Sequence, residues 1–149
     1  METRINEISL SYRPKRKAEH WPKISSSSLA AHVIYQNWDQ NTIAVYESFK
    51  ILLLNNSNKV KGIYQISAGG ITGTLVDLRL LFAVALKSLS VALILVHNHP
   101  SGTLRPSEAD KQLTRKIKGG ADFLDIKILD HIIINPKGDY YSFVDEGIL

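Results

Sequence analysis

The sequence predicts one α/β domain, in which strands and helices alternate around a single hydrophobic core. Six consecutive apolar residues at 91–96 are typical of a strand that is buried on both faces. Alternating apolar residues at 43–54, then a turn-rich stretch and a second strand-like segment at 60–67, predict a hairpin. The segment 107–118 has the apolar period of a helix, and a length of 149 residues suits one domain.

An extended arm is expected at the N-terminus, because residues 1–24 show no periodicity and contain two prolines. We therefore predict an arm at 1–24 and the domain at 25–149. The net charge of the chain is +4, and part of it lies in four basic residues of the arm: Arg13, Lys15, Arg16 and Lys17. Such a cluster is more often a solvated tail than a binding surface. Contact with nucleic acid stays open as the alternative.

The hairpin follows a predicted helix at 29–38, for which Ser25 to Ser28 offer N-cap residues. In the strand expected at 43–54, Glu47 is the only polar residue on the apolar face. The other residues of that face are Ile43, Val45, Phe49, Ile51 and Leu53. A glutamate here can reach water from an edge strand or a local bulge. Alternatively, it lies in a partly dry cleft as a candidate general base.

The remaining segments predict a buried helix and two more strands. A helix at 75–89 has one apolar stripe, formed by Leu78, Leu81, Phe82, Ala85 and Leu89. Strands are expected at 125–135 and 140–144. Gly119 and Gly120 are expected to end the helix predicted at 107–118. His131 lies in the first of these strands. We expect a hydrogen-bonded structural histidine there, with a ligand or acid–base role as the alternative.

The stretch from Val91 to Asp110 contains the strongest chemical signal. His97 and His99 follow the buried strand two positions apart, so their imidazoles point to the same side. Asp110 lies in the first turn of the helix that comes next. Two histidines and one carboxylate suit a divalent metal with one coordination position left open for water.

Ser107 and Asp110 also fit an ordinary helix start, as a capping box with Asp in place of Glu. However, Asp110 lies on the apolar face of the helix, where an unpaired carboxylate is costly. That face also contains Leu113, Thr114 and Ile117. A bound metal would satisfy the carboxylate, and the spacing alone leaves both interpretations open.

Composition excludes several kinds of site. The chain contains no cysteine, which rules out disulfides, thiolate metal ligands and a cysteine nucleophile. The apolar runs are far too short to cross a membrane, and the N-terminus lacks the apolar core of a secretory signal. We therefore expect a cytoplasmic protein with no membrane partner.

The chain resembles the JAB/MPN metalloproteins, which carry the JAMM motif. That motif is an upstream glutamate, then His-x-His, seven residues, Ser, two residues and Asp. It is matched here by Glu47, His97, His99, Ser107 and Asp110. Within this group the sequence is most similar to the RadC-like branch. Four segments carry this similarity: HNHPSG at 97–102, PSEAD at 106–110, LDHIII at 129–134 and YYSF at 140–143.

The resemblance implies a three-layer α/β fold with some α+β character, in which helices flank a curved mixed sheet as in the cytidine-deaminase-like JAB/MPN fold. It implies that His97, His99 and Asp110 bind one Zn²⁺. Glu47 would accept a proton from water and pass it to the leaving amine, and Ser107 would donate to the oxyanion. The implied reaction is hydrolysis of a peptide, isopeptide or other amide bond in an unknown protein or peptide.

Two departures from the family pattern leave alternatives open. Asn98 stands between the histidines, where the general JAMM pattern has Ser or Thr and RadC-like proteins have Asn. Full-length RadC proteins carry an N-terminal helix–hairpin–helix region, for which this chain is too short. The second departure weakens an inherited role at DNA. Two alternatives to a hydrolase stay open: a non-catalytic interaction module, since JAB/MPN domains without the metal residues exist, and a DNA-repair-associated protein, which the basic arm allows.

Overall fold

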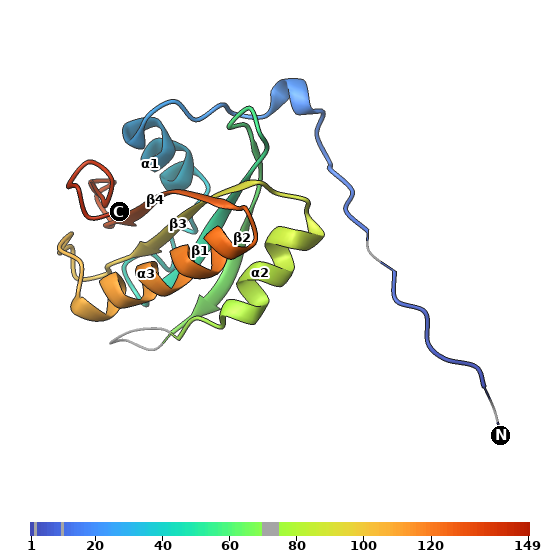
Figure 1. Cartoon of the computed structure of the whole chain (residues 1–149). Coiled ribbons are helices and arrows are strands. Elements are labelled where there is room, and N and C mark those ends of the chain that lie inside the picture. Colours follow the sequence, from blue (N-terminus) through green and yellow to red (C-terminus); the bar gives the residue numbers. More distant parts are fainter. Residues whose placement is uncertain (2, 10, 70–74) are drawn as a thin grey trace.

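The computed structural model describes residues 1, 3–9, 11–69 and 75–149. In these residues one five-stranded sheet has the order β2-β1-β3-β4-β5, with helices packed against it (Figure 1). The helices are η1 (Ala18–His20, a 3-10 turn), α1 (Ser27–Gln36), α2 (Leu78–Lys87) and α3 (Glu108–Phe123). The strands are β1 (Ser48–Leu54), β2 (Val60–Ala68), β3 (Ala92–Asn98), β4 (Lys127–Ile134) and β5 (Tyr140–Ser142). The predicted α/β class is confirmed.

The sheet is mixed, as expected for this fold. β1 pairs with β2 as the predicted antiparallel hairpin, and β1 also pairs antiparallel with β3. β3 and β4 are parallel, so α3 serves as the crossover between them. β5 closes the sheet by pairing antiparallel with β4.

Both faces of the central strand are covered, which explains its uninterrupted apolar run. Ala92, Ile94 and Val96 of β3 belong to the core cluster that contains α1 residues. Leu93 and Leu95 belong to the cluster that contains α2 and α3 residues. Figure 1 shows α1 on one side of the sheet, with α2 and α3 on the other, so the domain has three layers.

The strand predicted at 43–54 is wrong at its start, because β1 begins only at Ser48. The preceding residues form turns, in which the amide of Ile43 donates to the Asp39 carbonyl and that of Tyr46 donates to Thr42. Ile43 joins the core under α1, whereas Val45 is 57% exposed, so the alternation before Ser48 does not reflect a strand. Glu47 consequently precedes the sheet and does not belong to its apolar face.

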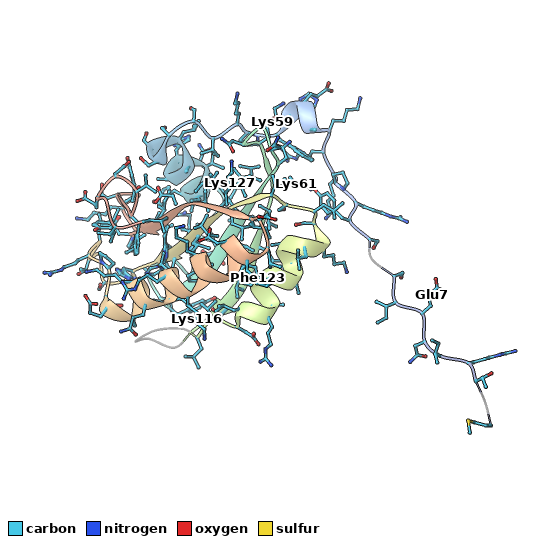
Figure 2. The ribbon with its side chains drawn as sticks, viewed as in Figure 1. Glu7, Lys59, Lys61, Lys116, Phe123 and Lys127 are labelled. Carbon is cyan, nitrogen blue, oxygen red and sulfur yellow. The ribbon has the colours of Figure 1, made fainter. Side chains whose placement is uncertain are left out.

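The helix predicted at 107–118 also differs, because α3 passes through Gly119 and Gly120 and ends at Phe123. A Cβ added to Gly120 would lie 2.8 Å from Cε2 of Phe82, so this glycine lets α2 and α3 approach closely. The close contact offsets the helix-breaking tendency of glycine. Figure 2 shows Phe123 at the end of α3, where its side chain is 91% exposed.

The helix predicted at 75–89 is shorter at both ends. The side chain of Asp77 accepts from the amide of Arg79 at 2.9 Å and caps α2, which then runs from Leu78 to Lys87. Four of the five stripe residues are buried or pack against the core, as predicted. Leu89 is the exception: it lies beyond the helix with φ 53° and is 75% exposed.

The predicted arm is extended over much of its length and leaves the domain in Figure 1. The four clustered basic residues of the arm, Arg13, Lys15, Arg16 and Lys17, are all exposed. The arm meets the domain at two places. Nζ of Lys61 lies 4.7 Å from the Tyr12 ring, and the backbone of Lys23 forms an isolated antiparallel β-bridge with that of Lys59. Residues 2 and 10 of the arm lie outside the described residues. Among the described helices, none is long and apolar enough to cross a membrane.

Candidate metal centre

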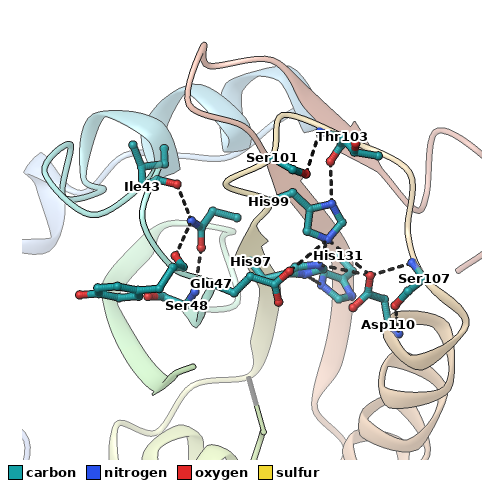
Figure 3. A network of polar contacts seen from close by, with 12 residues as sticks. Ile43, Glu47, Ser48, His97, His99, Ser101, Thr103, Ser107, Asp110 and His131 are labelled. Atoms are coloured by element: carbon teal, nitrogen blue, oxygen red, sulfur yellow. Dashed lines mark hydrogen bonds and ion pairs between the residues drawn. The ribbon is translucent and has the colours of Figure 1, made fainter. Parts of the chain in front are cut away.

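Two histidines emerge together from the carboxyl end of β3. His97 is the penultimate residue of the strand, and His99 continues its direction because its amide donates to the Ile134 carbonyl at 2.9 Å. Their Nε2 atoms lie 2.9 Å apart, so both imidazoles face the same point (Figure 3). Nδ1 of His99 lies 2.6 Å from the carbonyl oxygen of Thr103, to which it donates. That contact leaves Nε2 of His99 free to bind a metal.

The start of α3 brings Asp110 to the histidines. Oδ2 of Asp110 lies 3.4 Å from Nε2 of His97 and 3.6 Å from Nε2 of His99. The same oxygen accepts the amide of Ser107 at 2.8 Å, and Oγ of Ser107 accepts the Asp110 amide at 3.0 Å. The capping box and the ligand position are therefore compatible, because the box holds the carboxylate in place.

The donor set fits a zinc ion. The ligand atoms of His97, His99 and Asp110 all lie within 4.8 Å of one another. In a tetrahedral site with bonds of about 2.0–2.1 Å, neighbouring ligand atoms are about 3.3 Å apart, close to the spacing seen here. Two imidazoles and a carboxylate with an open fourth position are typical of catalytic zinc sites.

Electrostatics favour a cation at this point. Burial raises the pKa of the Asp110 carboxyl, but its contacts with His97 and His99 outweigh burial and hold that pKa well below its usual value. Burial lowers the pKa of His99, whereas Asp110 and the Thr103 carbonyl raise it, and the net direction is upward. The carboxylate is thus ionised and half-buried beside the two imidazoles, where a metal ion can replace bound protons.

Glu47 lies next to this group, directly before β1. It is half-buried, and its Oε1 is 4.0 Å from Nε2 of His99. Its carbonyl oxygen accepts the amide of Gly69 at 2.8 Å, which ties this segment to the end of β2. The predicted glutamate is therefore close to the three candidate ligands, although it comes from a loop and not from a strand.

Ser107 lies at the N-cap of α3 and is exposed. Because its Oγ accepts a hydrogen bond from Asp110, the hydroxyl proton remains available to donate. The predicted role at an oxyanion stays a prediction.

In the sequence, Asn98 stands out only as a departure from the general JAMM pattern, but in the structure it has a clear position. Its side chain points away from the histidines and is fully buried. Its Oδ1 accepts the amide of Ser48 at 2.7 Å, and its Nδ2 donates to the carbonyls of Ile43 and Tyr46 at 2.8 and 2.9 Å. Asn98 thus fixes the segment on both sides of Glu47. A polar residue at the end of a buried strand was the available signal, since it requires buried partners.

His131 is the hydrogen-bonded structural histidine that the sequence predicts. It is fully buried behind His97, with Nε2 at 2.8 Å from Nδ1 of His97. Burial holds the pKa of His131 well below its usual value, so the imidazole is neutral. Because this nitrogen contacts His97, His131 supports the ligand set from behind.

Comparison with protein families matches residues 24–148 to the RadC-like JAB domain. A UPF0758 protein of Flavobacterium johnsoniae is 59% identical over 103 residues, covering 69% of this chain and 44% of the relative. That of Porphyromonas gingivalis is 47% identical over 103 residues, covering 69% of this chain and 45% of the relative.

A third relative matches a longer part of the chain. The UPF0758 protein of Desulfitobacterium hafniense is 38% identical over 128 residues, covering 86% of this chain and 55% of the relative. This chain thus spans about half the length of these relatives. The match covers most of the chain and includes Glu47, both histidines, Ser107 and Asp110, and on this basis the chain belongs to the RadC-like JAB domain family.

Proposed function

We propose that the protein is a zinc-dependent hydrolase of a peptide, isopeptide or other amide bond, of the JAMM metallopeptidase type. The observation that carries the proposal is the convergence of three ligand atoms within 4.8 Å of one another, with a half-buried glutamate 4.0 Å from one of them. A ligand set without an adjacent base would suit a structural metal equally well. The nearby Glu47 favours catalysis.

In this proposal, His97, His99 and Asp110 hold one Zn²⁺, which supplies the Lewis acidity that polarises the scissile carbonyl and acidifies water. Glu47 accepts the proton of the attacking water and returns it to the leaving amine as the C–N bond breaks. The Ser107 hydroxyl donates to the carbonyl oxygen as negative charge develops there. Burial of His97 and of His131 next to it keeps water from the side of His97 that faces away from the metal.

The direct test compares zinc content and turnover in three proteins. We expect one zinc per chain in the wild type and in Glu47→Gln, and none in a His97→Ala, His99→Ala, Asp110→Ala variant. In Glu47→Gln, kcat on fluorogenic peptide and lysine-isopeptide probes should fall by about 10²–10⁴-fold, because the general base is lost.

Two results would contradict this assignment. Loss of zinc in Glu47→Gln would make Glu47 a ligand, and stoichiometric zinc in the triple variant would place the metal elsewhere. A wild-type protein that binds zinc but cleaves none of the probes would favour the non-catalytic interaction module. In that case the ligand set would still describe a metal site.

A nucleic-acid-associated role is the second candidate, supported by the exposed basic residues of the arm. Residues Arg13, Lys15, Arg16 and Lys17 are all exposed. If they contact phosphates, DNA affinity should fall steeply with salt, and replacing all four with alanine should reduce that slope. Affinity that is independent of salt would remove this candidate.

The cytoplasmic location also stays a prediction.

A further inference from the structure

A continuous line of hydrogen bonds runs behind the candidate metal centre and joins two of its ligands. Nδ1 of His97 lies 2.8 Å from Nε2 of His131, a contact visible in Figure 3. Nδ1 of His131 lies 2.6 Å from Oγ1 of Thr114. The Thr114 hydroxyl donates in turn to the carbonyl oxygen of Asp110 at 2.7 Å. The line thus starts at a ligand on β3, crosses β4 and returns to a ligand on α3.

The three side chains of this line are closed off from water. The exposed fraction is 2% for His97, 0% for His131 and 2% for Thr114. Aromatic rings cover both imidazoles: Phe49 stacks on His97 with centroids 6.2 Å apart, and Phe143 stacks on His131 at 4.5 Å. Apart from Nε2 of His97, which faces the other two ligands, each polar side-chain atom must therefore find its partner within the line. The rings also have little freedom to turn.

These contacts determine where the protons lie. Thr114 has one hydroxyl proton, and the Asp110 carbonyl can only accept it. Oγ1 of Thr114 then accepts from Nδ1 of His131, which leaves a lone pair on Nε2 of His131. That lone pair accepts from Nδ1 of His97. Nε2 of His97 is consequently free of a proton, and this is the atom that faces His99 and Asp110.

We propose that Thr114 and His131 form a positioning chain that sets the tautomer of His97 and keeps the lone pair of its Nε2 directed toward the metal. The inference rests on the proposed function only in assuming a bound metal. The proton positions follow from hydrogen bonds within the protein itself. A histidine ligand commonly donates its second nitrogen to a carboxylate, a carbonyl or water. Here the acceptor is another histidine, whose own tautomer depends on Thr114.

Thr114→Val is the discriminating variant, because valine keeps the shape of threonine and removes the hydroxyl. Without an acceptor for Nδ1, the His131 proton moves to Nε2, and His97 must then hold its own proton on Nε2. Nitrogen-15 NMR of metal-free protein at mildly alkaline pH reads these positions. We expect protons on Nδ1 of both histidines in the wild type and in Thr114→Ser, and on Nε2 of both in Thr114→Val.

Zinc affinity, measured by competition with a chelator, gives a second readout. Thr114→Val should bind zinc about 10–100-fold more weakly, as is typical when such outer partners are lost. Thr114→Ser should stay near the wild-type affinity because it retains the hydroxyl. Thr42→Val is a matched control: its hydroxyl donates to the Asp39 carbonyl outside the line, so affinity and tautomers should not change.

A proton on Nε2 of His131 in the wild type would overturn the proposal. Equal losses of zinc affinity in Thr114→Val and Thr114→Ser would also overturn it, since both changes would then act through packing. If the wild type shows the expected tautomers but binds no zinc, the proposed function fails and the tautomer assignment stands.

Discussion

At the residue scale, the position between the two histidines links the candidate ligands to the candidate base. Alternation along β3 turns Asn98 to the side opposite His97 and His99. There its amide binds the backbone of Ser48 and Tyr46, the two neighbours of Glu47. One strand end therefore presents ligands on one side and holds the glutamate segment with the other. A serine or threonine could not supply both the acceptor and the two donor bonds that Asn98 makes.

Replacement of Asn98 by alanine should separate positioning of Glu47 from zinc binding. We expect the free energy of unfolding to fall by about 1–3 kcal/mol, because buried backbone groups lose their partners. Turnover should fall with it, while zinc content stays at the wild-type value. Asn55→Ala is the control: this residue caps the β1–β2 turn by accepting two amides, so it should affect stability alone. Loss of zinc in Asn98→Ala would show that Asn98 supports the ligands themselves.

At the element scale, the first turn and the later turns of α3 have different roles. Its first turn holds Asp110 through the capping box with Ser107, and its later turns pack against α2. Two glycines lie in this later part, and only Gly120 meets a neighbour. Nothing lies within 4 Å of a Cβ added to Gly119, whereas one added to Gly120 would collide with Phe82.

These glycines make a matched pair for a stability test by chemical denaturation. Gly119→Ala should raise the free energy of unfolding by about 0.5–1 kcal/mol, because alanine favours the helix and meets no neighbour. Gly120→Ala should lack this gain, since its methyl group must displace the Phe82 ring. Equal gains in both variants would mean that the Phe82 ring does not pack closely against α3 at Gly120.

At the scale of the whole molecule, the candidate centre joins parts that folding brings together. The histidines come from β3, the aspartate from α3 and the glutamate from the loop before β1. An unfolded chain cannot present these groups at one point, so a metal should bind the folded state preferentially. Binding energy then adds to folding energy.

Zinc should therefore raise the melting temperature. At a free concentration about 100-fold above Kd, the added stability is about 2.7 kcal/mol, which corresponds to about 5–10 °C for a domain of this size. Differential scanning fluorimetry with and without zinc measures this shift. The variant lacking His97, His99 and Asp110 should show none. An equal shift in that variant would assign the stabilisation to another site.

The sequence by itself determined the fold class, the hairpin, the buried central strand and the candidate ligands. These features depend on local periodicity or on a fixed spacing, both of which can be read along the chain. His97 and His99 share a side because a strand alternates, and Asp110 lies near them because the loop 99–107 leads from β3 directly into the first turn of α3. The apolar surroundings of Asp110 in its helix were likewise visible in the sequence.

Only the tertiary structure decided which residues support the candidate ligands His97, His99 and Asp110. The start of β1 and the continuation of α3 through Gly120 depend on the side chain of Asn98 and the ring of Phe82, which come from distant segments. The partners of His131 follow from the parallel pairing of β3 with β4 and from α3 packing behind them. The physical reason is that a buried polar group is satisfied by whatever the fold brings within about 3 Å, irrespective of sequence distance.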